Sequence, residues 1–149
     1  AAAAPARNLR GRLSPTAGAL ASDRLVLAWA SLPGQIRPVS ALRSLVVVLP
    51  ALGGGAPEEG LIPVAAQLAQ QHVVVVAAVR DPRLGQMLHE RENAAGVFRA
   101  AAAERVLLER AAVSAELRHH GVEVVDAEPH HLPPQLADMY IRLKAAGRL

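Results

Sequence analysis

Val73-Val-Val-Val-Ala-Ala-Val79 is the stretch of this chain that decides its fold. It is apolar throughout, and so is the earlier run Ser44-Leu-Val-Val-Val-Leu49 after its first residue. A strand with one face in water would alternate apolar with polar side chains, so both runs are predicted to be strands covered on both faces. That pattern is typical of parallel sheets in α/β proteins, where helices pack on each face.

Helix signals follow each of these two strands. Pro63 suits the first turn of a helix that continues from Val64 to Gln71, and Asp81-Pro82 has the form of an N-cap followed by the first helical residue. The longest helix is predicted over 98–120, with Gly121 as its C-cap. Its apolar stripe is predicted from the spacing of Phe98, Ala102, Val106, Val113 and Leu117.

The end of the chain adds a third strand and a closing helix. Val122-Glu-Val-Val125 is more polar than the first two strands and is predicted to lie nearer an edge. Pro133-Pro134 starts a helix on which Leu136, Tyr140 and Leu143 share a face. Strands that alternate with helices through short links predict an α/β fold, a doubly wound, mostly parallel sheet with right-handed crossovers and helices on both faces.

The first part of the chain has a different character. Residues 1–15 are predicted to be a linker that could include an edge strand, and 16–149 a single α/β domain. A helix is expected over 17–32 and is predicted to end at Pro33-Gly34. Pro38 then opens a short helical approach to the first strand.

Composition limits the classes of function. The 149 residues contain no cysteine, which excludes a disulfide framework and a thiolate metal site. No apolar run reaches the roughly 18 residues of a membrane span, so the chain is expected to be cytoplasmic or the soluble part of a membrane-anchored protein. Aromatic side chains that could stack on bases are nearly absent, so nucleic-acid binding is a minor alternative, carried by Arg7, Arg10 and Arg12.

Candidate chemistry is expected where parallel sheets bind ligands, beyond the carboxyl ends of the strands. The glycines at 53–55 lack both the third glycine and the Gly-Lys-Ser/Thr of phosphate-binding loops, and there is no serine elbow. The residues favoured for binding a ligand or partner are Arg80, Asp81 and Asp126. Asp81 and Asp126 could also be the carboxylate pair of a small hydrolase or ligand-binding domain, although Asp81 already has a capping role.

The six histidines include the neighbouring pairs His119-His120 and His130-His131. Neighbours on a helix point about 100° apart, so one pair is not expected to chelate a single ion. A zinc site needs three or four convergent ligands. For His119-His120 the expected role is a favourable interaction with the negative end of the helix. No metal and no cofactor are predicted.

Four segments occur in an order that resembles a known family. They are Val79-Arg-Asp-Pro82, Ala100-Ala-Ala-Ala-Glu-Arg105, Gly121-Val-Glu-Val-Val-Asp-Ala127 and Leu136-Ala-Asp-Met-Tyr-Ile-Arg-Leu-Lys-Ala-Ala-Gly-Arg-Leu149. Residues 44–149 are similar to the carboxy-terminal half of the bacterial domain-of-unknown-function family fifty-eight. The fold of that family is similar to the von Willebrand factor A domain.

The resemblance implies an adaptor without enzyme activity, often encoded beside a MoxR-type AAA+ ATPase and often anchored by membrane helices. Domains of this fold bind a divalent ion through Asp-x-Ser-x-Ser, a threonine and an aspartate. This chain departs from that pattern. Pro50-Ala51 stands where Thr-Asp is expected, and none of its aspartates begins an Asp-x-Ser-x-Ser motif. The prediction is therefore a metal-free protein-interaction domain, in a chain that is either a fragment lacking the first metal-binding strand or a domain that has lost the site.

Overall fold

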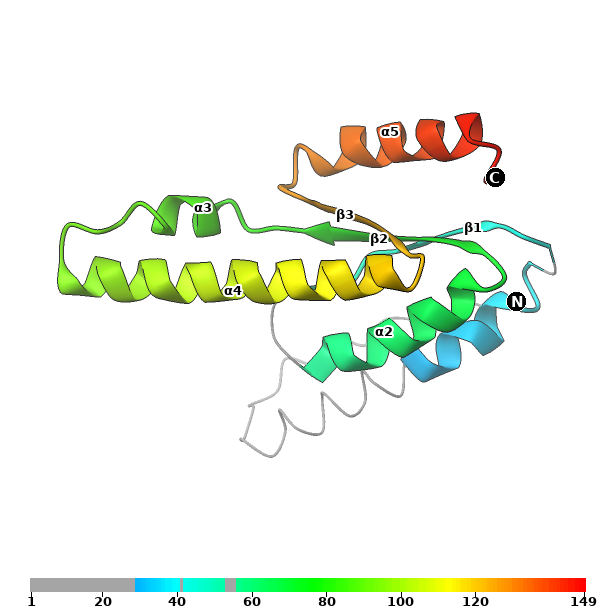
Figure 1. The fold of residues 1–149 in the computed structure, drawn as a ribbon, viewed down its shortest axis with the longest axis horizontal. Coiled ribbons are helices and arrows are strands. Elements are labelled where there is room, and N and C mark those ends of the chain that lie inside the picture. Colours follow the sequence, from blue (N-terminus) through cyan, green and yellow to red (C-terminus); the bar gives the residue numbers. More distant parts are fainter. Residues whose placement is uncertain (1–28, 41, 53–55) are drawn as a thin grey trace, which may run out of the picture.

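The computed structural model describes residues 29–40, 42–52 and 56–149 (Figure 1). Residues 29–36 are helical. The later elements are β1 (Leu45–Val48), α2 (Ala56–Ala69), β2 (Val73–Val79), α3 (Arg83–Met87), α4 (Ala94–His119), β3 (Glu123–Ala127) and α5 (Leu132–Ala145). This order confirms the α/β class, although α2 begins at Ala56, seven residues before Pro63, which was predicted to lie in its first turn. No helix in the described part combines the length and the apolar character needed to cross a lipid bilayer.

The three described strands form one parallel sheet in the order β1-β2-β3. Val47 lies opposite Val75, and Val76 lies opposite Val124. β2 is therefore central in this sheet, and all of its side chains except Val79 are buried. The predicted parallel pairing of the first two apolar runs is confirmed, and so is the edge position of the third strand within the described sheet.

Helices cover both faces of the sheet: α2 and α4 lie on one side and α5 lies on the other (Figure 1). Because successive side chains of a strand point to opposite faces, β2 contributes to two cores. The core on the α2–α4 side includes Val74, Val76 and Leu117. The core on the α5 side includes Val75 and Met139. The apolar side chains of β2 thus contribute to the core on each face of the sheet.

Both ends of α4 are defined by local hydrogen bonds. At the start, Asn93 Oδ1 accepts from the backbone N–H of Gly96 at 2.8 Å, so the helix begins before its predicted first residue. At the end, Gly121 has a φ of 78°, and the N–H of Val122 donates to the carbonyl of Leu117 at 3.0 Å. This closing arrangement favours glycine, which adopts positive φ without steric cost, and it confirms the predicted end of the helix.

The apolar stripe predicted for α4 is wrong in its first half. Phe98 is 77% exposed and Ala102 is exposed as well. The buried face instead carries mainly small residues, with one arginine: Gly96, Ala100, Ala103, Arg110, Ser114 and Leu117. Close packing explains the difference, because a Cβ added at Gly96 would lie 2.8 Å from the carbonyl oxygen of Glu90.

The segment before β1 also differs from its prediction. The helix at 29–36 continues through Pro33-Gly34, since the carbonyl of Pro33 still accepts from the N–H of Arg37 at 3.1 Å. Residues 37–39 form a turn rather than the short helix expected from Pro38. The linker and edge strand predicted over 1–15, with Arg7, Arg10 and Arg12, and the glycines at 53–55 lie outside the described residues.

One side of α5 packs against the sheet and forms a groove with β1. Leu136, Tyr140 and Leu143 line a common groove with Leu45 and Val47 of β1. This confirms that the three predicted residues share a face of the helix. Tyr140 nevertheless stays half exposed, so this face is only partly covered.

We predict that Val75→Asp prevents folding. Val75 is 1% exposed at the centre of β2, and an unpaired carboxylate buried there costs several kcal/mol, comparable with a net stability of about 5–15 kcal/mol. Val79→Asp is the control, because it places the same charge at the exposed end of the same strand. Circular dichroism and thermal unfolding compare the two proteins. A soluble Val75→Asp protein with a native spectrum would refute the prediction.

Candidate functional site

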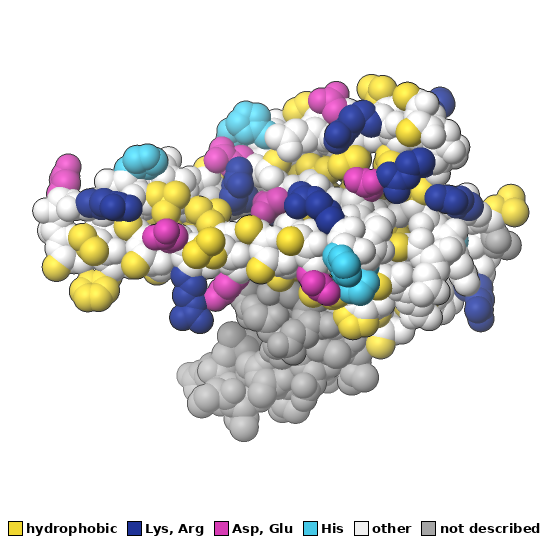
Figure 2. Space-filling model, in the orientation of Figure 1, with side chains coloured by type: hydrophobic (Ala, Val, Ile, Leu, Met, Phe, Trp, Pro, Cys, Tyr) yellow, Lys and Arg dark blue, Asp and Glu magenta, His cyan; other side chains and the backbone are white. Residues whose placement is uncertain are grey.

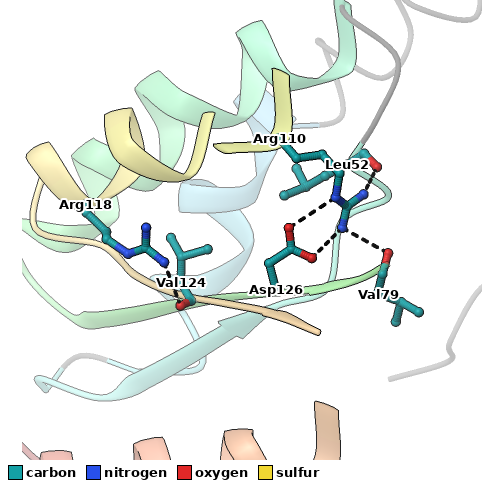
Figure 3. A network of polar contacts seen from close by, with 6 residues as sticks. All are labelled: Leu52, Val79, Arg110, Arg118, Val124 and Asp126. Carbon is teal, nitrogen blue, oxygen red and sulfur yellow. Dashed lines mark hydrogen bonds and ion pairs between the residues drawn. The ribbon is translucent and has the colours of Figure 1, made fainter. Parts of the chain in front are cut away.

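A buried arginine of α4 joins the carboxyl ends of the three described strands (Figure 3). Arg110 is 4% exposed, and its Nε and Nη2 donate to the two carboxylate oxygens of Asp126 in β3 at 3.1 and 2.7 Å. Nη2 also donates to the carbonyl of Val79, the last residue of β2, at 3.1 Å. Nη1 donates to the carbonyl of Leu52, just beyond β1. One guanidinium group therefore contacts the carboxyl ends of β2 and β3 and the segment that follows β1.

The Arg110–Asp126 pair has the geometry of a strong interaction. Two nearly parallel N–H···O bonds combine opposite charges with a fixed planar arrangement. The carboxylate is only 17% exposed, so solvent and salt screen the pair weakly. Loss of one partner from such a pair leaves an uncompensated buried charge, which costs about 3–5 kcal/mol. The network is thus a strong constraint on how the strand ends and α4 fit together.

The residues predicted to bind a ligand or partner lie on neighbouring strand ends. Asp126 belongs to the arginine pair. Asp81 is exposed, and its Oδ1 accepts a hydrogen bond from the backbone N–H of Arg83 at 2.9 Å. α3 begins at Arg83 with Pro82 as its N-cap, so Asp81 lies one residue before the N-cap, the position that was predicted for it. Arg80 follows β2, and its backbone N–H donates to the carbonyl of Ala127 at 2.8 Å. The two predicted carboxylates therefore contact different protein partners.

Arg110 was not among the predicted site residues. Arginine on a helix is ordinarily exposed, so the residue type alone does not indicate that Arg110 is buried. The available signal is its position: Arg110 lies one heptad from Ala103 and one heptad from Leu117, both of which are buried. A charged residue between two core-facing positions of a helix indicates a buried partner on the neighbouring element.

The turn that connects β3 to α5 brings Glu128, His130 and His131 together. One ligand atom from each of the three side chains lies within 4.8 Å of the other two, and Glu128 Oε2 is 3.9 Å from His130 Nε2. Over the residues that the structure describes, no other trio of histidine and acidic side chains converges in this way. The carbonyl of Glu128 accepts from the N–H groups of His131 and Leu132, both at 2.9 Å, which fixes the backbone of the turn.

The other histidine pair has different surroundings. His119 and His120 close α4, with ring centroids 5.6 Å apart, and His120 Nε2 lies 3.1 Å from Glu116 Oε1. Arg118 and His119 are the basic residues of the last helical turn, the placement that a helix C-terminus favours. Arg118 also donates to the carbonyl of Val124 at 3.5 Å (Figure 3).

α3 and the first half of α4 project beyond the strands (Figure 1). We call residues 83–108 the arm. Val97, Phe98 and Leu108 are each more than half exposed on it, and Figure 2 shows apolar side chains along this part of the surface. Beside Leu108 lies a hollow of about 580 Å³ that is also lined by Leu88 and Leu107. The arm therefore combines exposed apolar side chains with a concave surface.

Charged side chains surround the apolar residues of the arm. Arg99 Nε lies 2.7 Å from Glu90 Oε2, and Arg105 Nε lies 2.8 Å from Oε1 of Glu109, just beyond the arm. The hydrogen bond to Glu109, and then its negative charge, raise the pKa of Arg105. Exposed pairs of this kind add little to stability. They place charged side chains on the same part of the molecule as the exposed apolar ones.

Comparisons with protein-family models, with curated proteins and with solved structures found no match for this chain. A parallel α/β sheet supports many unrelated functions, so the fold alone does not select one. The function must be inferred from particular residues and from their surroundings.

We predict that Arg110→Leu lowers the free energy of unfolding by about 3–5 kcal/mol, because Asp126 is left as an uncompensated buried charge. Adding Asp126→Leu removes that charge and should restore part of the loss, although the carbonyls of Val79 and Leu52 stay unpaired. Urea unfolding of both variants measures the difference. Arg105→Leu, at an exposed position of the same helix, is the control and should keep the wild-type midpoint. A double variant no more stable than Arg110→Leu would contradict this account.

Proposed function

We propose that this chain is a non-enzymatic protein-interaction domain of the von Willebrand A-like class, an adaptor for a partner such as a MoxR-type AAA+ ATPase. The observation that carries the proposal is the apolar surface of the arm. Val97, Phe98 and Leu108 are more than half exposed on a part of the molecule that projects from the sheet (Figure 1). We take these exposed apolar side chains, which lie along one projecting helix with charged residues beside them, as the protein-interaction site.

Phe98 is the strongest single feature of this surface. It is the only phenylalanine of the chain, and it is 77% exposed. Aromatic side chains that enter a partner's pocket often supply the largest individual contributions to binding. A helix presents such a side chain on a rigid backbone, which reduces the entropy lost on association. The hollow beside Leu108 offers a complementary place for a side chain of the partner.

The hydrogen bonds already made by the carboxylates at the strand ends also support an interaction role. The carboxylate of Asp126 accepts two hydrogen bonds from Arg110, and the carboxylate of Asp81 accepts one from a backbone amide. The alternative function, a small hydrolase or ligand-binding domain, would need these carboxylates to receive a proton or hold a ligand. Each would first have to give up a contact that stabilises the local structure, so the interaction role is favoured.

The described topology supports the finer fold assignment within this proposal. A parallel sheet in the order β1-β2-β3, with α2 and α4 on one face and α5 on the other, fits half of a doubly wound sheet. In such a sheet a further strand would pair with the outer edge of β1. Ala51 carries no oxygen ligand, so the partner would be recognised through the arm rather than through an ion held by the von Willebrand A ligand pattern.

A binding experiment with a defined partner tests the proposal. We expect the chain to bind a recombinant MoxR-type AAA+ ATPase from the same organism. Phe98→Ser should weaken that binding by about thirtyfold, because an aromatic anchor contributes about 2 kcal/mol or more. Ile141→Ser is the matched control, since Ile141 is a large apolar side chain of α5 that is 62% exposed and lies outside the arm. Isothermal titration calorimetry gives the three affinities.

Different results would exclude different parts of the proposal. Failure of the wild-type chain to bind the ATPase would exclude that partner. Equal losses in Phe98→Ser and Ile141→Ser, or no loss in either, would exclude the arm as the binding surface. Circular dichroism of both variants confirms that they are folded, which is expected because both side chains are exposed.

A further inference from the structure

We infer that the turn between β3 and α5 is a binding site for a divalent transition-metal ion such as Zn²⁺, held by Glu128, His130 and His131. The inference stands independently of the proposed function. Two imidazoles and one carboxylate form a ligand set that zinc and its neighbours in the first transition series accept. Mg²⁺ and Ca²⁺ prefer oxygen ligands alone, so they are not expected to occupy this site.

The distances suit a small tetrahedral ion. One ligand atom of each side chain lies within 4.8 Å of the other two, and the Glu128 Oε2 to His130 Nε2 distance is 3.9 Å. Around zinc, with bonds of about 2.0–2.2 Å, neighbouring ligand atoms stand about 3.3–3.6 Å apart. The three atoms must therefore approach one another by an ångström or so. Rotation of exposed side chains supplies that movement while the backbone stays in place.

The two imidazole rings are oriented in a way that permits shared coordination. Their centroids lie 5.0 Å apart and their planes are inclined by 58°, so the rings are tilted rather than stacked. His130 and His131 precede α5, which begins at Leu132. His131 already has helical φ and ψ values, and the spacing of three residues in this helix-like turn places it near Glu128. One nitrogen of each ring lies within 4.8 Å of a carboxylate oxygen of Glu128.

The backbone of the turn is held before any ion binds. Pro129 restricts φ within the turn, and the carbonyl of Glu128 accepts two N–H groups from the residues that follow. The turn starts from Ala127 and ends at Leu132, both of which are buried in the core on the α5 side. Ligands on a fixed turn lose less conformational entropy on binding than ligands on a free segment.

Three protein ligands leave at least one coordination position open. In a tetrahedral zinc site that position takes water or a group from another molecule. The turn lies beyond the carboxyl end of β3, the edge at which parallel sheets bind their ligands, and both histidines are exposed. An ion held here would be accessible to solvent and to a donor group of a second molecule.

Zinc affinity of the untagged 149-residue chain tests the inference, measured by competition with a chromophoric chelator. We expect one Zn²⁺ per chain, a higher unfolding temperature with Zn²⁺, and no displacement by Mg²⁺. His130→Ala and His131→Ala should each weaken the affinity by more than about tenfold, and Glu128→Ala should weaken it too. The matched control is His119→Ala/His120→Ala, which removes the other neighbouring pair, beside Glu116, and should leave the affinity unchanged.

Several results would overturn the inference. These are the absence of stoichiometric binding, binding that survives His130→Ala/His131→Ala, and displacement of zinc by Mg²⁺. Equal losses in the variants of the two histidine pairs would show that zinc binds histidines at random on the surface. All four histidines are exposed, so the variants are expected to fold, and circular dichroism checks this.

Discussion

The guanidinium group of Arg110 sets the position of the longest helix on the sheet. A buried charge is tolerated only where partners surround it, and here the partners come from the ends of three parallel strands. α4 therefore has one register in which the charge is compensated. A shift of one residue along the helix would turn the side chain by about 100° and separate it from Asp126. Contacts between apolar side chains are less directional, so the core alone would define this register less sharply.

The same register determines which part of the molecule is exposed. With Arg110 fixed at the strand ends, the N-terminal half of α4 extends beyond the sheet beside α3 (Figure 1). The buried side of that half carries small residues, and at Gly96 the chain passes so close that a side chain would not fit. The bulky apolar residues Val97 and Phe98 consequently lie on the outer side. A structural need at the middle of the helix thus creates an apolar surface near its start.

The features that were predictable from sequence depend on composition or on local backbone. The unbroken apolar run of β2 predicts burial on both faces, and Gly121 predicts a helix end because a left-handed φ is a local property. The stripe on α4 failed because it followed bulky residues such as Phe98, whereas the buried face carries small residues such as Ala103. The role of Arg110 was not predictable, because its partner stands 16 residues later and no local pattern shows that the two side chains face each other.

In the candidate site, too, the location follows from the topology of the sheet, whereas the contacts of each side chain depend on residues distant in the sequence. The rule that parallel sheets bind ligands at their carboxyl ends predicted a site at this edge, where Asp126 is engaged by Arg110 of α4 and the next turn gathers the side chains that we propose bind a metal ion. Pro133-Pro134 restricted the closing helix to start near them, and α5 begins at Leu132, with His131 already in helical φ and ψ. The two features are also linked physically. The arginine pair holds the end of β3, so the turn that follows starts from a fixed position. The side chains of that turn can therefore converge on one ion while its backbone stays in place.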